Sequence, residues 1–147
     1  MKKLLLSLVL CLLLIGVAAN AEDKVENPRP CKQCGMDRVV FSYSRMLILY
    51  TDGTNAGTCS LNCAAVEMKE NKGKQVKSLK VADYNSRKLI DARTATWVIG
   101  GGRSGVMTAL PKWAFIKKDD AQKFVKENGG RVTTFDEALN LALRENE

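Results

Sequence analysis

Two pairs of cysteines are the residues in this chain whose types and spacing support the most specific chemistry. They stand as Cys31-x-x-Cys34 and Cys59-x-x-x-Cys63 in a chain of 147 residues that contains no histidine. Thiolates bind soft metal ions, whereas the missing imidazole excludes a Ser–His or Cys–His couple and a His-rich hydrolytic zinc site. The pattern therefore predicts a protein that is not an enzyme and holds a thiophilic metal, copper(I) first and zinc second.

Local geometry favours bringing each pair to one ion. Cys31 and Cys34 are two residues apart, so both sulfurs can turn toward one ion around a tight knuckle, and Gly35 suits the turn that follows. Cys59 and Cys63 share one face of a helix that begins near residue 60, where the helix N-terminus favours the thiolate form. A hairpin within the 24 residues between the pairs would bring them together.

Two other interpretations of the cysteines remain open. Four cysteines in an exported chain are also typical of two disulfides, and a loop closed between the pairs would contribute roughly 3 kcal/mol to stability. A thioredoxin-type oxidoreductase would use Cys31 as its nucleophile, but prolines precede Cys31 and Gly35 follows the pair, which suits that motif poorly.

Methionine favours copper(I) over zinc. Met36 directly follows the knuckle, and Met107 lies beside the glycine-rich stretch 100–105, where a thioether has little core to fill. Thioethers are good ligands of copper(I) and poor ligands of zinc. Met46 and Met68 are instead predicted to fill the core.

The first residues predict export. A basic start is followed by an apolar run over 4–17 and by Ala19-Asn20-Ala21, which is typical of a signal peptide cleaved after residue 21. Leucines flank Cys11, so we expect a hydrophobic residue of the signal there, not a lipid anchor. Without Lys2 and Lys3, 21 basic residues face 16 acidic ones, and the net charge falls from +7 to +5. We expect a periplasmic protein with no nucleic-acid partner.

Hydrophobic periodicity and turn residues predict an α+β fold of two small ββαβ units. The cysteine-bearing unit spans 22–92 and the second unit, with the Met107 loop and a closing helix, spans 93–147. The predicted elements are strands 39–43 and 46–50, a turn at 51–54, a helix from N-cap Ser60 to residue 70, an extended stretch 76–84, strands 94–99 and 113–117, a helix 119–127 with Asp119 as N-cap, strand 131–134 and helix 135–145.

A series of short motifs resembles the NosL family, accessory proteins that deliver copper(I) to nitrous oxide reductase. The motifs are Cys31-x-x-Cys34-Gly35-Met36, Val81-Ala82-Asp83-Tyr84, Ile90-Asp91-Ala92, the Met107 loop, Ala114-Phe115, and Ala121-x-x-Phe124 with Gly129-Gly130. The resemblance implies periplasmic copper(I) binding through Cys34 or Cys31 together with Met107, and a client cuproenzyme or copper transporter as partner.

The first half is also similar to heavy-metal domains of the TRASH/YHS type, through Cys34-Gly35-Met36, Phe41, Tyr50, Cys59 and Cys63. The second cysteine pair could form a structural four-cysteine zinc site or bind further copper. The predicted metal ligands are therefore Cys31, Cys34, Met36, Cys59, Cys63 and Met107.

Overall fold

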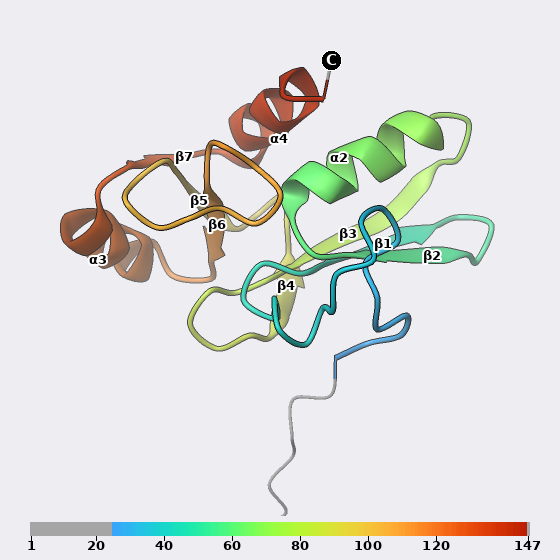
Figure 1. Cartoon of the computed structure of the whole chain (residues 1–147), viewed down its shortest axis with the longest axis horizontal. Helices are drawn as coiled ribbons and strands as arrows, with labels where there is room; N and C mark the ends of the chain where they lie inside the picture. Colours follow the sequence, from blue (N-terminus) through green and yellow to red (C-terminus); the bar gives the residue numbers. More distant parts are fainter. Residues whose placement is uncertain (1–24, 147) are drawn as a thin grey trace, which may run out of the picture.

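A computed structural model describes residues 25–146, so the predicted signal peptide over 1–21 lies outside the described residues. The described chain forms two antiparallel sheets and three helices (Figure 1). In chain order the elements are β1 (Met46–Tyr50), β2 (Asn55–Thr58), α2 (Leu61–Glu70), β3 (Val76–Ala82), β4 (Leu89–Asp91), β5 (Thr96–Ile99), β6 (Lys112–Phe115), α3 (Lys118–Asn128), β7 (Arg131–Thr133) and α4 (Phe135–Arg144). The α+β class is confirmed.

The first sheet has the strand order β2-β1-β3-β4, and every neighbouring pair is antiparallel. Alternate residues of β1 are buried, with Met46, Ile48 and Tyr50 facing the core, because successive side chains of a strand point to opposite faces. Helix α2 covers this sheet (Figure 1). The unit matches the predicted ββαβ pattern, extended by the short strand β4.

The second sheet has the order β6-β5-β7, with α3 packed against it. Helix α4 packs against α2 of the first unit, and its residues Phe135, Ala138 and Ala142 join the core that contains Ile48 and Leu79. Residues of both sheets enter this core, and a second core cluster joins Val98 and Phe115 of the second sheet to Cys31, Cys59 and Cys63. The division at residues 92 and 93 stays a prediction. Within residues 25–146, no helix has the length and apolar character needed to cross a bilayer.

The predicted strand over 39–43 is wrong. Residues 38–44 form consecutive turns, closed by hydrogen bonds such as Phe41 N–H to Asp37 O (3.2 Å) and Arg45 N–H to Phe41 O (3.1 Å). The Asp37 carboxylate accepts from Val39 N–H at 2.8 Å and so starts the turn. Val39 and Val40 are consequently exposed, and the apolar residues that suggested a strand do not pack in one.

The strand that pairs with β1 in place of the predicted strand 39–43 is β2. Sequence reasoning missed β2 because Asn-Ala-Gly-Thr contains no strongly apolar strand former. Gly57 stands there because the Arg38 side chain crosses the strand. A Cβ atom at residue 57 would lie 2.3 Å from Arg38 Nη1, which leaves no room for any larger residue. The hairpin turn at Asp52-Gly53 is confirmed.

Two of the three helices begin at the predicted residue. Ser60 caps α2 by accepting a hydrogen bond from Cys63 N–H, as predicted. Asp119 does not cap α3, which begins at Lys118 after the N-cap residue Lys117. Asp119 lies in the first turn instead, where a carboxylate interacts favourably with the helix dipole. Helix α4 begins where predicted, after Thr134.

Candidate metal-binding site

The sulfur atoms of Cys31, Cys34, Cys59 and Cys63 all lie within 4.8 Å of one another. The first two come from the knuckle before β1, Cys59 follows β2 directly, and Cys63 lies in the first turn of α2. Three of the four are buried and Cys34 is half-buried. The structure thus brings together the four cysteines that the sequence predicted as ligands, which we call the cysteine cluster.

The cluster has the dimensions of a tetrahedral thiolate site. Metal–sulfur bonds of about 2.3 Å at tetrahedral angles place neighbouring sulfurs about 3.8 Å apart. The Sγ atoms of Cys34 and Cys59 are 3.5 Å apart, and those of Cys59 and Cys63 are 3.7 Å apart. A single ion fits among these sulfurs with little movement of the chain.

Backbone hydrogen bonds fix the shape of the knuckle. Gly35 adopts φ of +75°, which only glycine reaches without strain, and its N–H donates to Cys31 O at 2.9 Å. Cys31 N–H donates to Met36 O at 2.8 Å, and Lys32 N–H donates to Gly57 O of β2 at 2.9 Å. The last bond attaches the knuckle to the strand that leads into Cys59.

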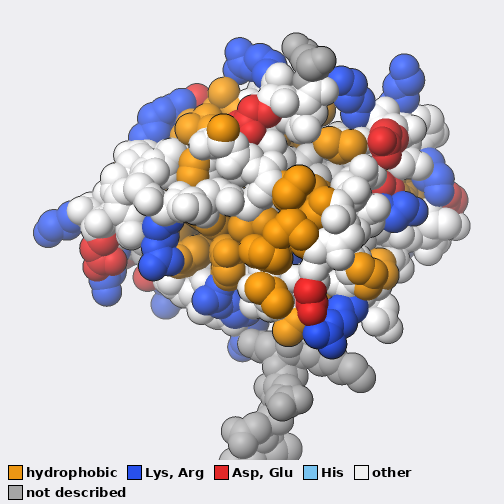
Figure 2. Space-filling model, viewed as in Figure 1, with side chains coloured by type: hydrophobic (Ala, Val, Ile, Leu, Met, Phe, Trp, Pro, Cys, Tyr) orange, Lys and Arg blue, Asp and Glu red, His pale blue; other side chains and the backbone are white. Residues whose placement is uncertain are grey.

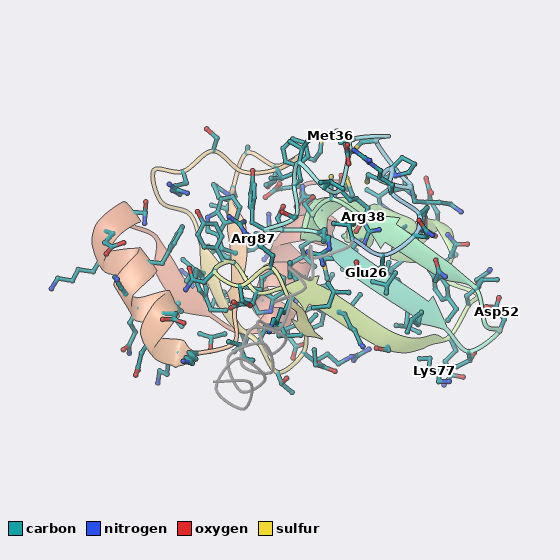
Figure 3. The ribbon with its side chains drawn as sticks, turned by 90° about the horizontal axis from the view of Figure 1, so that it is seen from below. Glu26, Met36, Arg38, Asp52, Lys77 and Arg87 are labelled. Atoms are coloured by element: carbon teal, nitrogen blue, oxygen red, sulfur yellow. The ribbon has the colours of Figure 1, made fainter. Side chains whose placement is uncertain are left out.

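A buried arginine connects the segment before the knuckle to the first sheet. The Arg38 side chain is fully buried and donates to the carbonyl oxygens of Glu26 (2.7 Å), Pro28 (2.6 Å), Met46 (2.9 Å) and Thr58 (3.3 Å). The Glu26 carboxylate forms an ion pair with Arg38. It forms a second ion pair with Arg45, whose Nη2 lies 2.8 Å from Glu26 Oε1. Figure 3 shows Glu26 and Arg38 close together under the first sheet. Arg38 therefore joins the segment before the knuckle to β1 and β2.

Met107 lies at the same site. A cavity of about 180 Å³ is lined by Cys34, Cys63 and Met107 together with Gln33, Asn62, Val66 and Asn146. Met107 is 50% exposed and adopts a left-handed backbone conformation, φ +54°. Met107 thus lines the same cavity as the half-buried Cys34 and the buried Cys63. We call this cavity the metal pocket.

Met36 is placed differently. It is half-buried and packs against the hydrophobic cluster around the cysteines, and it is not among the described residues that line the metal pocket. Figure 3 shows it at the margin of the molecule. Its role as a ligand stays a prediction.

Hydrophobic side chains gather on one face of the molecule. Figure 2 shows them across the middle of this face, where Figure 1 draws the start of α2 beside the loop between β5 and β6.

Comparison with known proteins identifies the family of this chain. The NosL family model matches residues 22–141. The chain belongs to the NosL family. A crystal structure of the copper chaperone NosL from Shewanella denitrificans superimposes with a TM-score of 0.60 and 26% sequence identity, covering 78% of this chain and 92% of that one. No curated protein matches the sequence.

Electrostatics within the cysteine cluster of this NosL protein favour one thiolate. Hydrogen bonds from the thiols of Cys59 and Cys63 lower the pKa of Cys31. The same bonds to Cys31, together with burial, raise the pKa of Cys59 and of Cys63. The cluster thus holds a first negative charge readily, whereas further thiolates need a cation among them.

A second polar network, which sequence reasoning missed, holds the Met107 loop against this NosL protein's first unit. The buried Lys112 ammonium donates to Asn62 Oδ1 (3.0 Å), Thr108 Oγ1 (3.0 Å), Leu110 O (2.9 Å) and Glu145 Oε1 (2.7 Å). Asn62 precedes Cys63, and Thr108 follows Met107. The network therefore links the neighbour of Met107 to the neighbour of Cys63. The sequence around Lys112 does not indicate that Asn62 and Glu145, which lie far away in the chain, are its partners.

Replacing Glu145 by glutamine is expected to lower the free energy of unfolding by about 1–3 kcal/mol at pH 7, because Lys112 then stays buried without a counter-charge. The value lies below that of a fully buried pair because the Glu145 side chain is 25% exposed. Chemical denaturation of both proteins measures the difference.

The pH dependence gives a second readout of the same change. Burial raises the pKa of Glu145, but hydrogen bonds from Lys112, Thr108 and Asn62 outweigh it, so the folded-state pKa is lowered. Its contribution is complete above the unfolded pKa of about 4.3 and is lost as pH falls through the lower folded value. The Glu145→Gln variant should therefore lose less stability on acidification. An unchanged acid profile would contradict this assignment.

Proposed function

We propose that this protein is an exported copper(I) chaperone that receives the ion at the metal pocket and passes it to a periplasmic client. The observation that carries the proposal is that Met107 lines the same cavity as Cys34 and Cys63. Thiolate and thioether together select copper(I), because zinc binds thioethers poorly. Membership of the NosL family and likeness to a copper chaperone support this function.

The pocket geometry supports transfer by ligand exchange. Cys34 is half-buried and Met107 is half-exposed, whereas Cys31 and Cys59 are buried behind them. A copper(I) ion held by two or three soft ligands keeps an open position that a client's ligand can attack. Cys34 and Met107 are thus the ligands that an approaching client displaces, and no covalent bond of the protein is broken.

Export and the client are parts of the same proposal. The signal-like first 21 residues support a periplasmic location, and nitrous oxide reductase is the client that the family resemblance suggests. Mixing the copper-loaded protein with that reductase in its copper-free form, under anaerobic conditions, tests delivery. Copper should appear in the reductase faster than from a copper–chelator complex of equal affinity.

A second candidate function is a zinc-stabilised interaction module, which the near-tetrahedral cysteine cluster favours. In that protein one zinc ion would be held by four thiolates and Met107 would have no part in binding. The two functions therefore differ in the role of the thioether.

Met107→Leu is expected to weaken copper(I) binding by at least about 10-fold, the lower limit seen for losing even a group that supports a metal ligand. Leucine keeps the bulk of methionine but offers no sulfur. The measurement is an anaerobic titration of the reduced protein against a copper(I) chelator, with bound zinc quantified beforehand.

Met68→Leu is the matched control, since Met68 is half-buried on α2 and packs against the core. It should leave copper affinity unchanged, and zinc affinity should be the same in all three proteins. If Met107→Leu binds copper(I) as tightly as the unmodified protein and retains one zinc ion per chain, the zinc-stabilised module becomes the better account of this protein's function.

A further inference from the structure

A second cavity, of about 320 Å³, shares no lining residue with the metal pocket. It lies between the turn that follows β3 and the glycine-rich loop after β5, and is lined by Tyr43, Tyr84, Arg87, Arg103, Ser104 and Trp113. Its volume is at the lower end of the range of small-molecule sites, about 300–1,000 Å³. We call it the arginine pocket.

Two arginines line this pocket, and no acidic residue is among its lining residues. Arg87 Cζ lies 5.0 Å from the ring centroid of Tyr43, and Arg103 Cζ lies 5.8 Å from that of Tyr84. Among residues 25–146 neither arginine forms an ion pair. The acidic residue of the same turn, Asp83, instead accepts from the backbone N–H groups of Ser86 and Ile116, each at 2.8 Å. Two positive charges beside one cavity attract an anion.

Two of the residues that line this pocket also carry a buried N–H group that lacks an acceptor. Arg87 Nη1 and Trp113 Nε1 are buried and form no hydrogen bond within the described chain. Trp113 is only 2% exposed. The other tryptophan is satisfied, because Trp97 Nε1 donates to Ala92 O at 2.8 Å. Buried donors are normally paired, so these two indicate an acceptor that comes from outside the chain.

We propose that the arginine pocket binds a carboxylate group, which receives hydrogen bonds from Arg87 and Arg103 and lies beside the indole N–H of Trp113. Arginine pairs with carboxylates through parallel N–H bonds, and the tyrosine rings form walls for an organic body. Arg103 and Ser104 belong to the loop that carries Met107, so an occupant holds that loop close to the metal pocket. The carboxylate comes from a small organic acid or from an acidic side chain of a docking protein.

Nuclear magnetic resonance of the indole N–H groups tests this directly, because the chain has two tryptophans and one is an internal control. Succinate is titrated into the uniformly ¹⁵N-labelled protein at constant ionic strength. The Trp113 indole signal should shift and saturate, whereas the signal of Trp97 should stay in place. The variant Trp113→Phe assigns the two signals.

Arg87→Gln and Arg103→Gln should each weaken succinate binding roughly 10-fold or more, because each removes a charged donor. Arg93→Gln, at an exposed arginine elsewhere, is the matched control and should bind like the unmodified protein. Arg103 is exposed, so its variant keeps the fold, and thermal unfolding of all variants checks this.

A parallel titration with a short glutamate-containing peptide identifies the source of the carboxylate. Saturable binding of succinate assigns a free organic acid, and saturable binding of the peptide alone assigns a protein side chain; both support the pocket. The proposal is overturned if sodium chloride of equal ionic strength produces the same shifts, if neither ligand moves the Trp113 signal, or if both arginine variants bind as the unmodified protein does.

Discussion

Replacing Arg38 by methionine is expected to lower the free energy of unfolding by about 3–5 kcal/mol, because four backbone carbonyl oxygens lose a charged hydrogen-bond donor and the ion pair with the 30% exposed Glu26 is broken. Methionine fills part of the space but donates no hydrogen bond. Glu26 then loses one of its two arginines. Four carbonyl oxygens lose their donor, those of Glu26, Pro28, Met46 and Thr58. Urea unfolding of the reduced, metal-free protein measures the loss.

The control for this change is Arg29→Met. Arg29 forms an ion pair with Asp37 on the surface, where its side chain is 66% exposed, so its removal should alter stability little. The two variants remove the same charge but differ in burial and in the hydrogen bonds to backbone carbonyls that only Arg38 forms. Equal losses of stability in both variants would mean that Arg38 acts through net charge and not through its buried contacts.

Cys59→Ala is expected to lower the affinity for copper(I) and for zinc by more than about 100-fold, the upper limit seen for losing a group that merely supports a ligand. Cys59 is fully buried, and its sulfur lies 3.5 Å from that of Cys34 and 3.7 Å from that of Cys63. Removing it takes one thiolate from the cluster, and the chain has no histidine that could replace it. Competition titrations with chelators for each metal measure the effect.

Comparison of Cys59→Ala with Met107→Leu shows which atoms hold which ion. Loss of zinc binding only in the first variant, and of copper binding in both, is the expected pattern. Circular dichroism of the metal-free proteins confirms that Cys59→Ala keeps the fold. Copper and zinc affinities equal to those of the unmodified protein would show that the cysteine cluster does not bind the metal.

Local sequence patterns determined the elements on which the site is built. Strand Met46–Tyr50, the Asp-Gly turn and the helix capped by Ser60 were predictable because burial alternation, turn propensity and capping act within a few residues. The cysteine spacings likewise indicated that each pair could face one ion. The family resemblance named Met107 as the partner of these cysteines, although its local sequence shows no contact with them.

Only the tertiary structure decided how these parts meet. The buried Arg38 side chain contacts Gly57 and Thr58, about 20 residues further along the chain, and no local pattern encodes that contact. The position of Met107 beside the cysteines depends on Lys112 and Glu145, which pair because α4 packs on α2. The amino-acid sequence by itself determined the ligand types and the short-range geometry. The distances between ligands far apart in the chain depend on core packing and buried charge pairs, which form only when the whole chain folds.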